Sequence, residues 1–165
     1  MWTLQGVWVV VTSLPVILLL RRPREAQPNL GLMDGIGAAL WGIGFLLELV
    51  ADLQKLYFRS LPANKSRFLD TGLWRHSRHP NYAGEICLWA GMSLLCSVGL
   101  RTWAELAACI ASPLFVHLLL TRVSGLPLLE KHAERTWGKE PAYQKYVRTT
   151  PILVPFIGRC GQFSV

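Results

Sequence analysis

The segment LWRHSRHPNYAGE, residues 73–85, carries more information about this chain than any other. Pro80 lacks a backbone N–H and has a preset φ, which suits the first position of a helix, and it pushes His79 toward an extended conformation. The segment therefore predicts a helix that begins at Pro80. The free N–H groups of its first turn, its dipole and the guanidinium groups of Arg75 and Arg78 together favour an anion site, most simply a phosphate site.

Two polar side chains lie just inside this predicted helix. Asn81 and Glu85 are four residues apart, so they share one helix face. Glu85 stands in a run that is otherwise typical of a membrane span, where a carboxylate is costly and marks a functional candidate. The alternative is a basic loop that touches lipid headgroups, with Glu85 neutralised by an arginine. We favour a binding site, because such loops are common but the combination with this amide and carboxylate is not.

The composition indicates a membrane protein of one domain. Of the 165 residues, 52% are hydrophobic and 16% are charged, against about 25% charged in soluble domains. The net charge of +7 could suggest nucleic acid, but the basic residues stand beside apolar runs and no nucleic-acid motif is present. We therefore expect an anionic lipid or cofactor as partner, and no nucleic acid.

The apolar runs predict an all-α integral membrane bundle with about four transmembrane helices and a cytosolic helical tail. The first run is followed, not preceded, by arginines, which favours a retained span over a secretory signal. The second is rich in glycine, which lets helix backbones approach closely in lipid. The tail should contain one helix ending at Trp137 and another over residues 141–148. The single domain, residues 1–165, thus comprises spans at 2–20, 31–50, 80–100 and 103–121 and a tail at 122–165.

The distribution of lysine and arginine predicts the orientation. With four spans, the loop at residues 21–30 and the turn at Arg101 share one side and hold four of the 17 basic residues. The other thirteen lie in residues 55–78 and 122–159. The positive-inside rule places this second side, with the anion site and the tail, in the cytosol.

A stripe of charged residues continues the second span into polar sequence. Glu48, Asp52, Lys55 and Arg59 fall at i, i+4, i+7 and i+11 of a helix. Ion pairs along the wet end of the helix are one interpretation. A binding role is the other, because Glu48 lies within the apolar run, where an unpaired carboxylate is costly.

Four arginines could surround one anion, and four exceed what a single monophosphate needs. A dinucleotide carries a pyrophosphate, and NADPH adds a ribose phosphate. A nearby carboxylate or amide could accept or donate a hydrogen bond to a ribose hydroxyl or a carboxamide. The arginines are Arg59, Arg67, Arg75 and Arg78, and the carboxylate or amide candidates are Glu48, Asp52, Asn81 and Glu85.

Other polar groups have simpler interpretations. In the tail, residues 130–135 together with Tyr143 and Tyr146 favour a solvated amphipathic surface helix. The four cysteines, at positions 87, 96, 109 and 160, form no CxxC pair and are typical of small buried side chains. His76 and His79 have no further ligands nearby, so we expect no metal site.

Several motifs resemble those of the membrane reductases typified by steroid 5α-reductase and the sterol C14-reductases, whose relatives include the isoprenylcysteine carboxyl methyltransferases. The similarity covers about residues 40 to 155 and is greatest to the branch with a steroid 5α-reductase C-terminal domain. The Arg78-His79-Pro80-x-Tyr82-x-Gly84 core is shared with the methyltransferases, whereas Asn81 and Glu85 look like the reductase version. The matching motifs are Glu48-x-x-x-Asp52-x-Gln54-Lys55, residues 72–85, Ser124-Gly125-x-Pro127-x-x-Glu130-Lys131, and Tyr143-x-x-Tyr146 before Pro155.

The resemblance implies a membrane oxidoreductase that binds NADPH from the cytosolic side and reduces a carbon–carbon double bond of a hydrophobic steroid-, sterol- or lipid-like substrate. In a eukaryote it implies the endoplasmic reticulum. It also implies that helices preceding the first span in the full family are missing here, so no catalytic residue can be named. By position, Asp52, Arg59, Arg67, Asn81 and Glu85 match cofactor contacts, and Tyr146 matches a tail tyrosine. Arg75 and Arg78 complete the expected cofactor site.

Two alternatives stay open at this point. One is a membrane methyltransferase that uses S-adenosylmethionine, since it would share the histidine–proline core. The other is a truncated, non-catalytic membrane protein.

Overall fold

The computed structural model describes residues 2–154 of the chain, and it confirms the all-helical fold class. About 77% of the chain is helical, and the described residues contain no strand. Cys160 and Pro155, which the sequence analysis named, lie outside this range.

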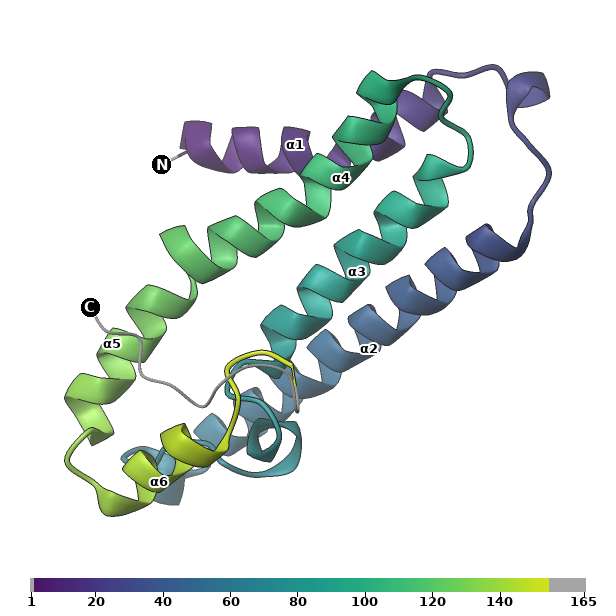
Figure 1. Ribbon diagram of the computed structural model, residues 1–165. Coiled ribbons are helices and arrows are strands. Elements are labelled where there is room, and N and C mark those ends of the chain that lie inside the picture. Colours follow the sequence, from purple (N-terminus) through teal and green to yellow (C-terminus); the bar gives the residue numbers. More distant parts are fainter. Residues whose placement is uncertain (1, 155–165) are drawn as a thin grey trace. The chain divides into compact units, whose positions relative to one another are not determined.

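Most predicted helix boundaries agree with the structure (Figure 1). One helix begins at Pro80, another ends at Trp137, and a short one begins at Pro141. The second helix continues to Ser60, so it carries the whole charged stripe. The helices are α1 (Trp2–Leu20), α2 (Leu32–Ser60), α3 (Pro80–Ser97), α4 (Trp103–Leu118), α5 (Leu126–Trp137) and α6 (Pro141–Thr149), with short 3₁₀ segments η1 (Arg24–Ala26), η2 (Pro62–Asn64) and η3 (Gly72–Arg75) and a π-helical turn η4 (Leu119–Val123).

Two of the helical stretches are long and apolar enough to cross a membrane. They are α2 and the continuous helical run Trp103–Trp137, which joins α4, η4 and α5. A third apolar helix, Gln5–Leu20, is shorter. The membrane association predicted from composition therefore has support in two helices, whereas the four-span arrangement stays a prediction.

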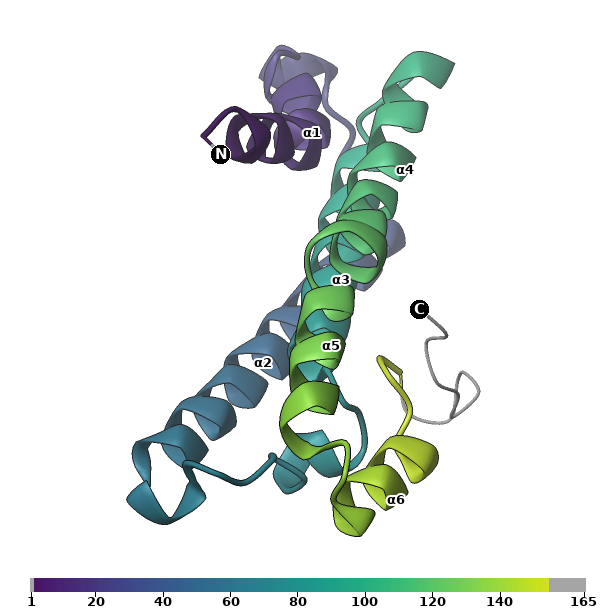
Figure 2. The ribbon, with the colours of Figure 1, turned by 90° about the vertical axis from the view of Figure 1, so that its left-hand side faces the viewer.

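The chain divides into two compact units. The first comprises residues 1–45 and 85–120, and the second comprises residues 46–84 and 121–165. Within the first unit, α1 crosses the N-terminal half of α4 (Figures 1 and 2). The buried side chains of Cys96, Leu100 and Cys109 form its core, in agreement with the prediction that these two cysteines are small buried groups.

Polar contacts fix the start of α4 in the first unit. Thr102 and Glu105 form a capping box, in which each side chain accepts a hydrogen bond from the other's backbone N–H. Glu105 also forms an ion pair with Arg22 at 2.7 Å. This carboxylate, which interrupts the predicted fourth span, thus has a structural role at the helix end.

Close backbone contact joins the first part of α2 to α3. A Cβ on Gly91 would lie 2.4 Å from the backbone N of Trp41 and 2.7 Å from the carbonyl O of Gly37. A Cβ on Gly37 would lie 2.9 Å from the backbone N of Leu95. Gly35 and Gly42 have open space instead. The small-residue prediction thus holds for Gly37 but not for every glycine of α2.

The second unit is built around Trp74 and holds the candidate site. Its core contains Ala51, Phe58, Leu69 and Trp74, and the Trp74 indole N–H donates to the Ala51 carbonyl at 3.0 Å. Gly72 has a φ of 61°, a conformation that other residues rarely adopt. This turn lets η3 place Trp74 against α2.

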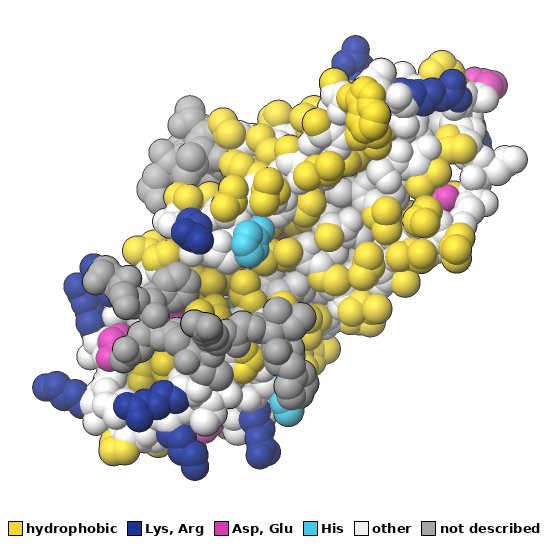
Figure 3. Space-filling model, viewed as in Figure 1, with side chains coloured by type: hydrophobic (Ala, Val, Ile, Leu, Met, Phe, Trp, Pro, Cys, Tyr) yellow, Lys and Arg dark blue, Asp and Glu magenta, His cyan; other side chains and the backbone are white. Residues whose placement is uncertain are grey.

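The surfaces of the two units differ in chemistry. Hydrophobic side chains cover the visible faces of α4 and of the first half of α2 (Figure 3). Lysines and arginines gather over the end of α5 and over α6 in the second unit (Figure 3). Apolar side chains facing outward suit contact with lipid, and basic ones suit a polar surface.

Candidate functional site

The second unit contains a cavity of about 360 Å³ between α2, α5, α6 and the loops that precede α3. Helical spacing explains why its side chains converge, since residues three or four apart share a face. Lys55 and Arg59 are such a pair on α2, and Tyr143 and Tyr146 on α6. The lining comprises Lys55, Arg59, Phe68, Leu69, Trp74, Arg78, His79, Leu129, Glu130, His132, Ala133, Trp137, Tyr143 and Tyr146.

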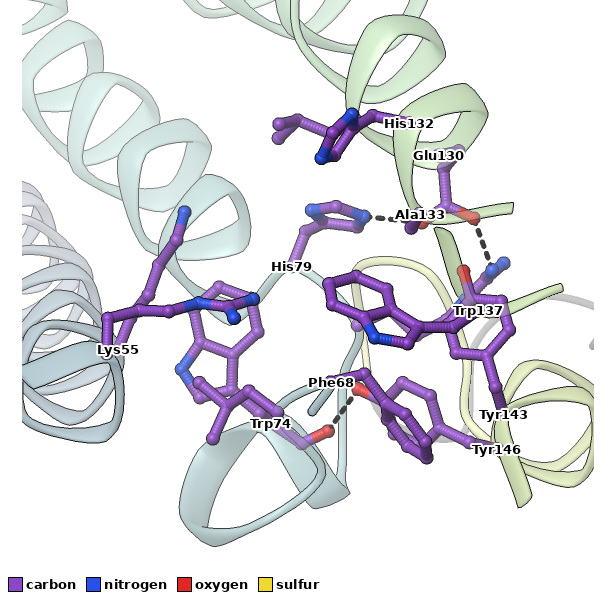
Figure 4. Close-up of a pocket in the computed structure, with 14 residues that line it drawn as sticks. Lys55, Phe68, Trp74, His79, Glu130, His132, Ala133, Trp137, Tyr143 and Tyr146 are labelled. Carbon is purple, nitrogen blue, oxygen red and sulfur yellow. Dashed lines mark hydrogen bonds and ion pairs between the residues drawn. The ribbon is translucent and has the colours of Figure 1, made fainter. Parts of the chain in front are cut away.

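One wall of the cavity carries positive charge over aromatic rings (Figure 4). The Lys55 ammonium lies 5.5 Å from the centre of the Trp74 ring, and the Arg59 guanidinium lies 5.5 Å from that of Trp137. Arg59 also donates to the Arg67 carbonyl at 3.1 Å. Within residues 2–154, no carboxylate lies within ion-pair distance of Lys55 or Arg59. Both charges are therefore available to an anionic ligand.

Glu130 on α5 anchors the opposite wall. One of its oxygens pairs with the Arg78 guanidinium, and the other lies 2.6 Å from Nε2 of His79. Arg78 and His79 are themselves fixed, because their backbone N–H groups donate to the carbonyls of Pro151 and Ile152 at 2.9 and 3.0 Å. Burial alone would raise the pKa of the Glu130 carboxyl, but the hydrogen bond from His79 and the charge of Arg78 outweigh it and lower that pKa.

Aromatic side chains close the remaining side of the cavity. The Phe68 ring lies 5.3 Å from that of Tyr143 and 5.5 Å from that of Tyr146. The Tyr146 hydroxyl donates to the Trp74 carbonyl at 2.6 Å. Burial raises the pKa of Tyr143 to about 12 and raises that of Tyr146 further. Both phenols therefore stay neutral at physiological pH.

A second polar pair lies outside the cavity lining. The Asn81 amide donates to the Asp52 carboxylate at 3.0 Å, and the buried Asn81 carbonyl oxygen has no hydrogen-bond partner among the residues that the structure describes. Buried acceptors are nearly always satisfied. This unpaired oxygen is therefore a candidate acceptor for a ligand.

A family model described as "Protein of unknown function (DUF1295)" matches residues 1–150. The chain belongs to this family. The DUF1295 family falls within the steroid 5α-reductase-like group, so the coarse level of the resemblance is confirmed. No curated protein and no solved structure matches the chain.

For this DUF1295 member, the structure brings three of the eight predicted cofactor residues to the cavity: Arg59, Arg78 and Tyr146. Arg67 and Arg75 have exposed side chains outside the lining. Asp52 and Asn81 contact each other in the same unit, and Glu85 belongs to the first unit.

Two expectations about charge can be compared with the structure. Arg78, expected to contact the cofactor, lines the cavity, but it is buried and forms an ion pair with Glu130, so its role toward a cofactor stays a prediction. The tail was expected to form a solvated amphipathic surface helix. Lys131, Glu134 and Arg135 of α5 are exposed, as this interpretation requires. Trp137 and Tyr143, in contrast, are only 8% and 4% exposed, and His132 is exposed but lines the cavity.

Several cavity residues were not predicted as site residues. Phe68, Trp74 and Trp137 are isolated aromatics with no periodic signal, and His79 was interpreted as the residue before a proline, as part of the Arg78-His79-Pro80 motif and as an incomplete metal ligand, but not as a cavity residue. The i, i+3, i+7 spacing of Glu130, Ala133 and Trp137 could have indicated a buried face of α5. Among the described residues, no three histidine, cysteine or acidic side chains gather around a common point that could hold a metal ion.

Proposed function

We propose that this protein is a membrane oxidoreductase that reduces a carbon–carbon double bond of a hydrophobic steroid-, sterol- or lipid-like substrate with NADPH. The observation that carries the proposal is the pair of cations on the aromatic wall of a cavity, Lys55 and Arg59, for which residues 2–154 supply no carboxylate partner. Membership of a family in the steroid 5α-reductase-like group supports the same reaction class.

The residues of the cavity fit such a cofactor. Lys55 and Arg59 can neutralise phosphate oxygens, and the flat faces of Trp74 and Trp137 suit stacking with a base or nicotinamide ring. The volume of about 360 Å³ is near the lower end of the usual range for ligand pockets, about 300–1,000 Å³. It therefore suits one end of a dinucleotide, with the remainder outside the cavity.

The polar pair beyond the cavity could hold that remainder. The unpaired carbonyl oxygen of Asn81 can accept a hydrogen bond from a ribose hydroxyl or a carboxamide, and Asp52 fixes the orientation of the amide. Such hydrogen bonds align the reacting groups, and small misplacements are costly in rate.

The cofactor carries the chemistry of the reduction, while the protein binds and orients the cofactor and the substrate and keeps water away from the reacting atoms. NADPH, when bound, supplies a hydride to the electron-poor carbon of the double bond. The other carbon needs a proton from an acid. Aromatic side chains such as Phe68 and Tyr143 exclude water from the cavity, which protects the reacting groups and strengthens the electrostatic contacts.

Location and orientation belong to the same proposal. A four-span arrangement with the loop at residues 55–79 and the tail in the cytosol gives the cavity access to soluble NADPH and leaves the apolar helices in contact with a lipid-soluble substrate. In a eukaryote the membrane is that of the endoplasmic reticulum.

Nucleotide binding by the purified protein tests the proposal. NADPH should bind more tightly than NADH, because only NADPH carries the ribose phosphate, which the exposed guanidinium groups of Arg67 and Arg75 outside the cavity lining can neutralise. Each charged hydrogen bond contributes about 1.5–3 kcal/mol, so Arg59→Met should weaken NADPH binding about 10- to 150-fold. The matched control is Arg135→Met, which removes an exposed charge of α5 outside the cavity lining. Equal binding of NADH and NADPH, or equal effects of the two variants, would contradict the proposal.

A further inference from the structure

His79 is the most firmly positioned titratable group of the cavity. Its backbone N–H donates to the Ile152 carbonyl at 3.0 Å. Its ring stacks on Tyr82 with centroids 5.6 Å apart and planes 18° apart, and its Nε2 lies 2.6 Å from Glu130. The backbone of His79 and its ring are thus each held by specific contacts.

The second ring nitrogen of His79 is open to the cavity. Nδ1 has no hydrogen-bond partner in the part of the chain that the structure describes. It is nevertheless not one of the fully buried polar atoms, so solvent or a ligand can reach it. The residue lines the cavity, and Figure 4 shows its ring with one edge toward Glu130 and the opposite edge turned away from it. A carboxylate on one nitrogen and a free second nitrogen is the arrangement of a positioned general acid or base.

We propose that His79 is the acid that protonates the substrate carbon through Nδ1–H, and that Glu130 is the positioning residue that holds its ring. The assignment rests on the proposed reduction and supplies the acid which that reaction needs.

The step balances in atoms and charge. One alkene carbon forms a C–H bond with the hydride from the cofactor, and the π-electron pair of the double bond moves to the other carbon. That carbon forms its own C–H bond with the proton of Nδ1, while the N–H electron pair stays on the ring. The imidazolium becomes neutral imidazole with its remaining proton on Nε2, which still donates to Glu130, and water later restores the Nδ1 proton.

The other protic groups of the cavity are less suited to this role. The Tyr146 hydroxyl already donates to the Trp74 carbonyl, and the Arg78 guanidinium pairs with Glu130. Burial raises the pKa of Tyr143 to about 12, which makes its phenol a weaker acid. His132 has an exposed side chain, and within residues 2–154 no hydrogen bond to its ring holds it in one orientation.

Histidine-selective nitrogen NMR in detergent micelles tests the assignment without a known substrate, because the chain has only four histidines. The signals of His79 are identified by their loss in His79→Gln. Neutral His79 should carry its proton on Nε2 in the wild type and in Glu130→Gln, whose amide oxygen can still accept. In Glu130→Ala the two tautomers should mix. NADP⁺ should shift the Nδ1 signal of His79 and leave that of His117, in the first unit, unchanged.

Three results would overturn the assignment: a proton on Nδ1 of neutral His79 in the wild type, a tautomer unaffected by Glu130→Ala, or NADP⁺ binding that leaves Nδ1 unperturbed. If Glu130→Ala does not fold, the tautomer of His79 in the wild type and the response of its Nδ1 signal to NADP⁺ still test the assignment of His79 as the acid. Calorimetry on the same samples separates the two proposals. If NADP⁺ does not bind while neutral His79 still carries its proton on Nε2, the proposed NADPH-dependent function is contradicted. The role of His79 as proton donor is then contradicted as well, because it rests on that function.

Discussion

Lys55 and Arg59 illustrate how single residues prepare this cavity for an anion. Each cation lies over an indole ring, a contact that contributes about 0.5–2 kcal/mol. A charged hydrogen bond to phosphate contributes about 1.5–3 kcal/mol. A phosphate ligand can therefore displace or add to the aromatic contact, whereas a carboxylate partner within the protein would have to be removed first.

Tyr146 gives the sharpest prediction about stability at this scale. Tyr146→Phe removes the hydrogen bond to the Trp74 carbonyl and leaves that acceptor without its partner. We expect a loss of about 1–3 kcal/mol, measured as a lower midpoint of thermal unfolding in detergent. Tyr57→Phe is the matched control, because Tyr57 is 69% exposed and should change little. Equal midpoints for the two variants would show that the Tyr146 hydroxyl does not stabilise η3.

The sequence predicted some of these residues and missed others for a physical reason. Helical spacing alone puts Lys55 and Arg59 on one face, so their convergence was predictable. The pairing of Arg78 with Glu130 joins residues 52 positions apart, and no local pattern encodes such a contact. For that reason the sequence predicted a ligand contact for Arg78 but not its ion pair with Glu130.

At the scale of elements, prolines allowed helix boundaries to be predicted from the sequence. Pro80 and Pro141 both stand at the first position of a helix, as their missing N–H groups favour. The glycines at which two helices come into close contact were harder to predict. Gly37 meets α3 and Gly42 does not, because this depends on the rotation of α2 about its axis, which the neighbouring helix sets.

The α2–α3 contact predicts a sharp difference between two glycine substitutions. In Gly91→Ala the new methyl would lie 2.4 Å from the Trp41 backbone, so the helices must separate at a cost of about 1–3 kcal/mol. In Gly42→Ala the methyl meets open space and should be neutral or slightly stabilising. Thermal unfolding of the two variants in detergent measures the difference. If both behave alike, the backbones do not approach as closely as described.

At the scale of the whole molecule, the charge asymmetry predicts topology. Thirteen of the 17 lysines and arginines fall on the side of the tail, so a glycosylation tag joined after residue 165 should stay unmodified in microsomal membranes. The same tag, with a spacer, in the loop at residues 21–30 should be modified and serves as the control. Efficient modification of the C-terminal tag would reverse the orientation and remove the cavity from cytosolic cofactors.

The measurement that tests the central claim most directly is cofactor binding by the purified protein, with NADPH and S-adenosylmethionine compared by calorimetry in the same detergent. The cations Lys55 and Arg59 suit phosphate groups, which NADPH carries and S-adenosylmethionine lacks. The account predicts saturable binding of NADPH and none of S-adenosylmethionine, with no displacement of the first by the second. Binding of S-adenosylmethionine without binding of NADPH would contradict the reductase assignment and favour a methyltransferase.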